Sequence, residues 1–223
     1  MPHVDVFWSF RSPYSYLATH RLVALARDWD VEVRVRPVLP IAIRTPDFFS
    51  QVNPLWPPYL LRDTWRIAEH AGIPYGWPRP DPVVQDIANR VIPKEQPYIH
   101  RLTRLGVEAV TRGRGLPFID EVSPVIWNGK IDGWHEGTHL ADAAARAGLD
   151  LGSMDAAIEA DPASRDAIIE QNQNDLTAVG HWGVPTMGFE GEPFFGQDRI
   201  DLLIWRMEQK GVKRRALDPS AMA

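Results

Sequence analysis

The sequence predicts an α/β fold whose two halves are separated by a large all-helical insertion. A strand, a helix and a second strand are predicted within residues 1–38. The middle of the chain then shows helical spacing with no convincing strand, and the chain closes with two short strands and an amphipathic helix. The predicted order is therefore β-α-β, a helical insertion, and β-β-α.

The first half is a βαβ unit. Residues 4–9 are β-branched and aromatic and predict a strand. The strand ends at Ser12-Pro13, a pair that suits the N-cap and first position of a helix, and helical spacing continues to about Trp29. Residues 31–36 alternate apolar and charged side chains, as a half-exposed strand does. The two strands should be parallel and joined by a right-handed crossover.

The rest of the chain divides into an insertion and a closing unit. Residues 39–175 are expected to form an inserted helical domain, and residues 1–38 and 176–212 a discontinuous thioredoxin-like domain followed by a flexible tail, 213–223. Five helices are predicted in the insertion, over 59–71, 98–112, 118–127, 138–147 and 164–179. The closing elements are strands at 184–189 and 193–195 and a helix at 198–211.

Composition excludes several functions. The net charge is −5, and no block of like charge precedes residues 213–215, so nucleic acid is not expected as a partner. No apolar run reaches the roughly 18 residues of a membrane span and the N-terminus does not resemble a signal peptide, so we expect a cytoplasmic protein with no membrane partner. The chain has no cysteine, which excludes thiol chemistry of its own.

Serines occupy the place where a redox protein of this fold holds its cysteines. Ser12-Pro13-Tyr14-Ser15 lies at the start of the first helix, with the spacing of a Cys-x-x-Cys motif. The free N–H groups and positive dipole end of that helix favour an anion, and a serine hydroxyl can donate one more hydrogen bond to it. Ser12 is thus placed to hold a thiolate that belongs to a ligand. A plain N-cap is the alternative.

Two further clusters flank the last strands. Pro185 opens a strand, and a cis bond would leave the Val184 backbone free to pair with a peptide-like ligand, whereas a trans proline on an edge strand would not. Gln197, Asp198 and Arg199 precede the last helix and could bind the amino and carboxylate groups of an amino acid. The alternative there is a capping aspartate beside a solvated arginine.

In combination these clusters resemble a known family. The segments VDVFWSFRSPYSYLA and GVPTMGFEGEPFFGQDRIDLL are similar to the 2-hydroxychromene-2-carboxylate isomerases and the kappa-class glutathione transferases, in the disulfide-oxidoreductase-like thioredoxin superfamily. The resemblance implies glutathione as cofactor, with Ser12 on its sulfur, Val184 before Pro185 on the cysteinyl backbone, and Asp198-Arg199 on the γ-glutamyl end. It also implies a cofactor contact for Asn53, and it allows a homodimer.

The function expected from these features is a glutathione-dependent cis-trans isomerase of a conjugated aromatic oxo-acid. Ser12 would be the catalytic residue, lowering the pKa of the bound thiol. Candidate walls for the small-molecule substrate are Trp8, Phe10, Arg11 and Trp56, with Arg11 as a carboxylate partner. For Trp8 the core is the alternative, since the first strand of such folds is buried on both faces. A glutathione transferase and a non-catalytic binder of glutathione or peptides are the alternatives.

One motif points to different chemistry. His135-Glu136-Gly137-Thr138-His139 fits the H-E-x-x-H pattern of zinc peptidases, and Glu159 follows at the distance of a third ligand. Zinc ligation requires both histidines on one continuous helix, yet glycines bracket the segment and Thr138 resembles a helix cap. No metal site is therefore expected.

Overall fold

The fold is built on a four-stranded sheet. In the computed structural model, which describes residues 1–45, 47–86 and 91–216, the strand order is β2-β1-β3-β4. β1 (His3–Trp8) pairs in parallel with β2 (Glu32–Pro37) and antiparallel with β3 (Thr186–Phe189). β3 pairs antiparallel with β4 (Glu192–Phe195), which closes the sheet on that side.

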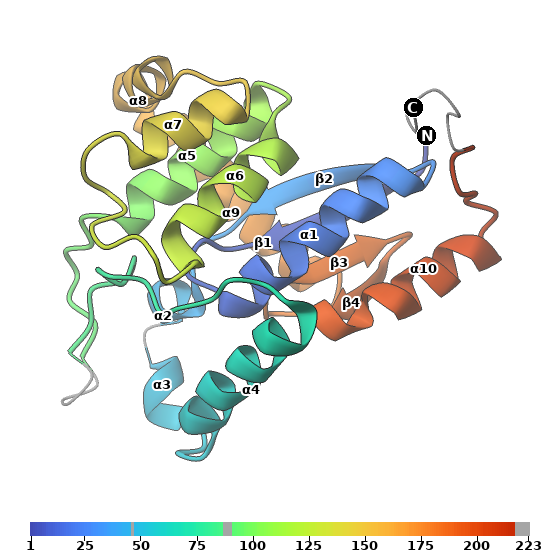
Figure 1. Ribbon diagram of the computed structural model, residues 1–223, viewed down its shortest axis with the longest axis horizontal. Coiled ribbons are helices and arrows are strands. Elements are labelled where there is room, and N and C mark those ends of the chain that lie inside the picture. The colour runs from blue at the N-terminus through green and yellow to red at the C-terminus, as the bar shows by residue number, and fades with distance from the viewer. Residues whose placement is uncertain (46, 87–90, 217–223) are drawn as a thin grey trace.

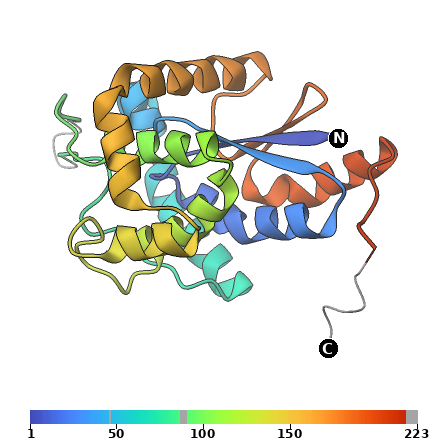
Figure 2. The same cartoon turned by 90° about the horizontal axis from the view of Figure 1, so that it is seen from above.

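Helices cover both faces of the sheet (Figures 1 and 2). α1 (Pro13–Asp28) and α10 (Ile200–Gln209) lie on one face, and α9 (Pro162–Ala178) lies on the other. A short 3-10 turn, η1 (Gln197–Arg199), precedes α10. The predicted thioredoxin-like arrangement of β-α-β and β-β-α halves is confirmed.

The remaining helices belong to the insertion. They are α2 (Ile41–Arg44), α3 (Phe48–Gln51), α4 (Trp56–Ala71), α5 (Ile99–Thr111), α6 (Gly115–Trp127), α7 (His139–Arg146) and α8 (Leu151–Ala160). One buried apolar cluster runs from the sheet through α1 into α5, α6 and α8. The insertion therefore packs on the sheet through a shared core, and the division at residues 38/39 and 175/176 stays a prediction.

Four helices differ from the sequence prediction for physical reasons. α4 begins at Trp56 rather than at Tyr59, because the two prolines that follow Trp56 fit the first turn of a helix. α8 was not predicted, since it buries only Met154 and Ile158 and so has a weak apolar period. It is held at its start by Asp150, whose Oδ1 accepts a hydrogen bond of 2.7 Å from the Ser153 N–H. α2 and α3 are single turns too short to show a period.

The start of the predicted flexible tail is attached to the body of the protein. Lys213 O accepts a hydrogen bond from Asp30 N, and Arg215 donates from its backbone N to Asp28 O. The Arg214 guanidinium lies 5.5 Å from the centroid of the Trp29 ring. Residues 213–215 therefore pack on the end of α1 and the loop that follows it, and the flexibility of the tail stays a prediction; residues 217–223 lie outside the described chain.

Candidate functional site

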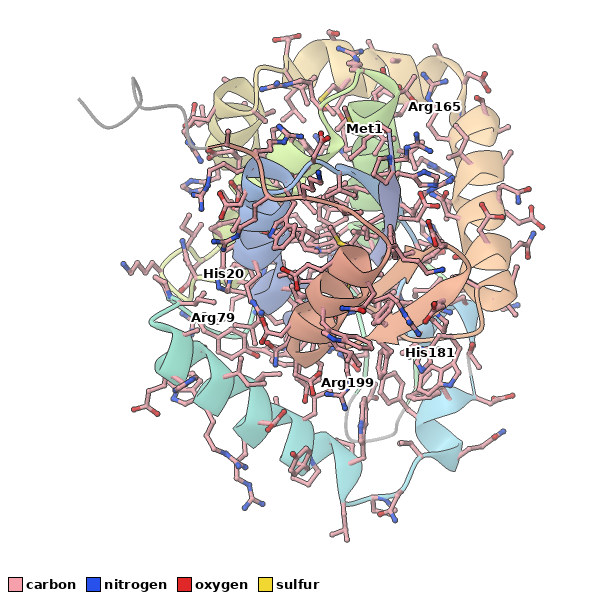
Figure 3. All side chains as sticks on the ribbon, turned by 90° about the vertical axis from the view of Figure 1, so that its right-hand side faces the viewer. Met1, His20, Arg79, Arg165, His181 and Arg199 are labelled. Carbon is pink, nitrogen blue, oxygen red and sulfur yellow. The ribbon has the colours of Figure 1, made fainter. Side chains whose placement is uncertain are left out.

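A large cavity lies where the carboxyl end of β1 faces the insertion. Its volume is about 1440 Å³. One wall comes from the loops after β1 and after β4 and from Gly183 and Val184 before β3, and the other comes from residues 40–92 together with Trp182. Figure 3 shows Arg199 and His181 on the sheet side, above α3 and α4. The predicted site residues that line the cavity are Arg11, Ser12, Trp56, Val184, Gln197, Asp198 and Arg199.

Ser12 is the N-cap of α1. Its Oγ accepts a hydrogen bond of 3.2 Å from the Ser15 N–H and donates one of 3.3 Å to Val184 O. The helix dipole and the free N–H groups of the first turn are directed at this point, and the chain supplies no acidic residue in that turn. Ser12 therefore has a hydroxyl proton that can turn toward a ligand, at a place that favours negative charge.

The loop before β3 lies beside Ser12. The peptide bond between Val184 and Pro185 is cis. Pro185 O accepts from Gly196 N at 2.9 Å, which ties this loop to the turn after β4. Within the described residues the Val184 N–H donates to no oxygen, so it is available to a ligand. The three clusters that the sequence placed in different segments thus meet at one edge of the sheet.

The turn after β4 carries an aspartate and an arginine side by side. Asp198 accepts a hydrogen bond of 2.8 Å from Arg199 Nη1, and both side chains are more than half exposed. Gly196 has φ +107°, and a Cβ there would stand 2.6 Å from Asp198 Oδ1. The glycine therefore permits the turn that folds Asp198 back. Arg21 of α1 anchors this turn through Gln197 O and Asp201.

Two residues that the sequence analysis predicted as walls of the substrate pocket do not line the cavity. Trp8 and Phe10 are fully buried and do not line the cavity. Trp8 Nε1 donates to Ser15 O at 3.0 Å, and the Trp8 and Phe10 rings meet edge to face with centroids 4.7 Å apart. β1 is the central strand with helices on both faces, so its large side chains are needed for the core. Trp8 therefore supports α1, and Phe10 packs against Phe118 of α6.

Arg11 lines the cavity but is not available as a carboxylate partner. Its Nε and Nη2 bind Asp81 at 3.0 and 2.8 Å, and its guanidinium lies 4.6 Å from the centroid of the Trp77 ring. Asp81 also accepts from Trp77 Nε1, Gln85 Nε2 and Val83 N. Arg11 therefore fastens the proline-rich loop, residues 73–82, to the start of α1, and the predicted role is corrected.

The Asn53 carbonyl is used within its own loop. Asn53 Oδ1 accepts a hydrogen bond of 2.9 Å from Leu55 N, which shapes the turn before α4. Asn53 does not line the cavity, whereas its neighbours Val52 and Pro54 do. Trp56, the first residue of α4, does line it, with its ring centroid 5.9 Å from that of Phe48.

Apart from Trp56, the individual residues of the second wall were not singled out from the sequence. Phe48, Phe49, Trp77 and Trp182 line the cavity together with Arg44. Arg44 Nε donates to Leu39 O at 2.8 Å and its Nη2 to Trp182 O at 2.6 Å. Tandem phenylalanines and an arginine in a segment without strong periodicity gave no signal, because the wall forms only when α2, α3 and the loop before β3 meet.

A tyrosine next to Ser12 is tied to α4. Tyr14 OH donates to Asp63 Oδ2 at 2.9 Å, and both residues line the cavity. Burial and the hydrogen bond to Asp63 raise the pKa of Tyr14 far above its usual value. The phenol therefore stays protonated at neutral pH and joins the first turn of α1 to α4.

The H-E-x-x-H segment does not form a continuous helix. His135 lies in a loop against Tyr98, with ring centroids 4.6 Å apart, and His139 is the first residue of α7. In the described part of the chain, no three histidine, aspartate or glutamate side chains are grouped as a metal site requires. None of the described helices combines the length and apolar character needed to span a membrane.

Comparisons with known proteins agree on the fold. The family model of the DSBA-like thioredoxin domain matches residues 3–96. A search of curated proteins gave no match. The solved structure of a 2-hydroxychromene-2-carboxylate isomerase is similar, with a TM-score of 0.70 and 22% identity over 93% of this chain and 95% of that one.

Two oxidoreductases are also similar. A probable DsbA oxidoreductase from Streptomyces coelicolor has a TM-score of 0.63 and 17% identity, covering 98% of this chain and 93% of its own. The cytosolic disulfide reductase DsbM from Pseudomonas aeruginosa, solved with GSH, has a TM-score of 0.57 and 16% identity over 92% and 99% of the two chains. These likenesses confirm a DsbA-like thioredoxin fold and the predicted resemblance at the level of fold.

Proposed function

We propose that this protein is a glutathione-dependent isomerase of a conjugated aromatic oxo-acid, similar in action to 2-hydroxychromene-2-carboxylate isomerase. The observation that carries the proposal is Ser12. In a DsbA-like fold without any cysteine, it places a hydroxyl at the N-terminus of α1, beside the cis-proline loop and inside a large cavity. Such a site can stabilise a thiolate but cannot supply one.

The sheet-side wall offers the groups that a γ-glutamyl tripeptide needs. The Val184 N–H, which has no acceptor among the described residues, is offered to the cysteinyl carbonyl. Asp198 and Arg199 offer a carboxylate for the α-amino group and a guanidinium for the α-carboxylate. When bound, glutathione would supply a thiolate whose reversible addition turns a conjugated double bond into a rotatable single bond. Gln197 lies in the same turn and adds an amide.

Ser12 would act by charge stabilisation. Its hydroxyl would turn from Val184 O to donate to the sulfur, and its hydrogen bond from Ser15 N would keep the oxygen in place. The dipole of the 16-residue α1 favours the same charge. A donor directed at a developing anion is worth about 100-fold or more in rate. Tyr14, which stays protonated, closes the site toward α4.

The proposal is tested first by binding and then by turnover. Isothermal titration with glutathione and with S-methylglutathione is expected to show micromolar to millimolar binding by the wild type and a large loss in Arg199→Ala. Arg34→Ala is the matched control, because Arg34 pairs with Glu32 on the exposed side of β2. Failure of the wild type to bind either ligand would contradict the proposal.

Product analysis separates the enzymatic alternatives. A screen of conjugated aromatic oxo-acids with catalytic amounts of glutathione is expected to give a geometric isomer of the same mass, with glutathione recovered. Consumption of glutathione into an adduct would assign the protein as a transferase instead. Binding without any turnover over the screen would support a non-catalytic binder, the reading we argue against.

A further inference from the structure

The cavity is larger than the proposed cofactor requires. Pockets for one drug-sized ligand measure about 300–1,000 Å³, whereas this cavity measures about 1440 Å³. If glutathione lies along the sheet-side wall, most of the insertion-side wall remains for the second reactant. This inference rests on the proposed function and concerns the class of that reactant.

We infer that the insertion-side wall binds a polycyclic aromatic carboxylate, with the carboxylate on Arg44 and the rings among Phe48, Phe49, Trp56 and Trp182. This assigns the substrate class by size and charge, and it assigns Arg44 as the residue that selects for an anion.

Arg44 differs from the other described arginines of the cavity. Arg11 is paired with Asp81 and Arg199 with Asp198, whereas the two hydrogen bonds of Arg44 both go to uncharged backbone carbonyls. No ion pair joins Arg44 to an acidic side chain within residues 1–45, 47–86 and 91–216. Its positive charge is therefore not neutralised by the described protein.

Burial makes this charge costly. Burial lowers the pKa of Arg44 to about 10, so the guanidinium is still protonated at neutral pH but has lost part of its hydration. A partly desolvated guanidinium without a carboxylate gains most from an incoming anion, which it can bind through two N–H groups. A planar carboxylate fits this requirement.

Arg44 is joined to the aromatic residues of this wall through Trp182. Arg44 Nη2 contacts Trp182 O, and the Trp182 ring centroid lies 5.5 Å from that of Phe48. Phe48 in turn lies 5.3 Å from Phe49 and 5.9 Å from Trp56, measured between centroids. Trp182 is 53% exposed, although a ring of that size is usually buried. These four rings offer an extended apolar surface next to one cation.

The same wall is joined to the reactive position. Trp182 is two residues before Val184, whose carbonyl accepts the Ser12 hydroxyl at 3.3 Å. An acid bound at Arg44 thus has its rings within the same cavity as the proposed thiolate position. The glycyl carboxylate of glutathione is the other source of an anion for Arg44, and the experiment separates the two.

The test measures binding of aromatic acids without glutathione. Tryptophan fluorescence and isothermal titration would follow benzoate, 2-naphthoate, anthracene-2-carboxylate and pyrene-1-carboxylate, with 1-pyrenemethanol as the uncharged match. We expect affinity to rise with the number of rings, and the pyrene acid to bind about 10-fold or more tightly than the alcohol. Equal affinity for acid and alcohol, or no rise with ring number, would overturn the inference.

Variants assign the carboxylate contact. Arg44→Gln is expected to weaken the pyrene acid about 10- to 100-fold and the alcohol about 3-fold or less. Arg114→Gln is the matched control, because Arg114 also donates to a backbone carbonyl, Ala147 O, and lies outside the cavity lining. Loss of glutathione binding in Arg44→Gln with unchanged acid binding would overturn the assignment.

The two proposals can fail separately. If the wild type binds glutathione but none of the acids, this inference fails and the proposed cofactor stands. If it binds the acids through Arg44 but not glutathione, the proposed function fails and the anionic aromatic site stands. Should Arg44→Gln not fold, the preference of the wild type for pyrene acid over pyrenemethanol decides the outcome by itself.

Discussion

The two walls of the cavity are built in different ways. The sheet-side wall consists of short loops joined by specific hydrogen bonds, such as Ser12 to Val184 O and Gly196 N to Pro185 O. The insertion-side wall consists of aromatic rings from α3, α4 and the loop before β3, beside Arg44, which forms no ion pair within the described residues. Polar geometry is fixed on the first wall, while size and apolar character dominate the second.

From this difference we expect the sheet-side wall to govern cofactor binding and turnover, and the insertion-side wall to govern which acceptor binds. A change in the sheet-side wall should remove cofactor binding or turnover, because each group there has a defined hydrogen-bonding role. A change in the insertion-side wall should alter which acceptor binds, because its aromatic side chains can be replaced without changing the proposed thiol position at Ser12. The predictions below test this division in order of decreasing effect.

The largest effect is expected for Ser12→Ala. Turnover should fall about 100-fold, because the hydroxyl that stabilises the thiolate is lost, while glutathione affinity changes about 3-fold or less. Loss of the N-cap should also lower the free energy of unfolding by about 1 kcal/mol. Steady-state kinetics, titration calorimetry and urea unfolding measure the three quantities.

Asp161→Ala controls for the cap. Asp161 Oδ1 accepts from Ser164 N at the start of α9, so its loss should cost similar stability. Turnover should be unchanged in Asp161→Ala. Equal losses of turnover in both variants would show that Ser12 acts only as a cap.

Next in size is Asp81→Asn. This change leaves the guanidinium of Arg11, a side chain only 15% exposed, without its carboxylate, so the free energy of unfolding should fall by about 1–3 kcal/mol. The KM for the acceptor should rise, because the proline-rich loop loses its ion pair with Arg11. The affinity for glutathione should not change. Asp132→Asn is the control, because its ion pair with Arg79 is exposed and should contribute less than about 1 kcal/mol.

Two tryptophan variants distinguish a core residue, Trp8, from a cavity-lining residue, Trp56. Trp8→Phe should lower the free energy of unfolding by about 1–2 kcal/mol, since Ser15 O and Thr19 Oγ1 lose a buried donor. It should leave acceptor selectivity unchanged. Trp56→Leu should do the reverse, lowering affinity for aromatic acids with a smaller effect on stability. The same selectivity change in both would place Trp8 in the wall after all.

The smallest effect is a pH dependence at His181. His181 Nδ1 accepts a hydrogen bond of 2.8 Å from Gly183 N, and burial lowers the pKa of His181 below its ordinary value of 6.5. The unfolded chain then binds the proton more readily, so stability is complete above about pH 6.5 and falls as the pH drops through the lowered folded-state pKa.

His181→Asn tests this dependence. Asparagine can accept the same N–H two residues on but does not titrate. Urea unfolding between pH 5 and 7.5 should show a shallower loss of stability in this variant than in the wild type. Parallel curves would assign the acid sensitivity to other groups.

The sequence predicts the fold and the sheet-side wall because their signals are local. Ser12-Pro13 marks a helix start after a β-branched run, and Pro185 and Asp198-Arg199 fall at strand and helix boundaries. The β-α-β and β-β-α halves then place them at one sheet edge. The insertion-side wall has no such signal. Phe48 and Arg44 meet Trp182 across more than a hundred residues, and Trp8 and Trp56 look alike until burial distinguishes them.

The most direct test of the account measures the pKa of the bound thiol. The ultraviolet absorbance of the thiolate of glutathione would be followed against pH in complex with the wild type and with Ser12→Ala, using S-methylglutathione as the blank. We predict a thiol pKa well below that of free glutathione in the wild-type complex, and a return toward the free value in Ser12→Ala. A bound thiol that titrates like free glutathione in the wild type would contradict the central claim that Ser12 and α1 stabilise a borrowed thiolate.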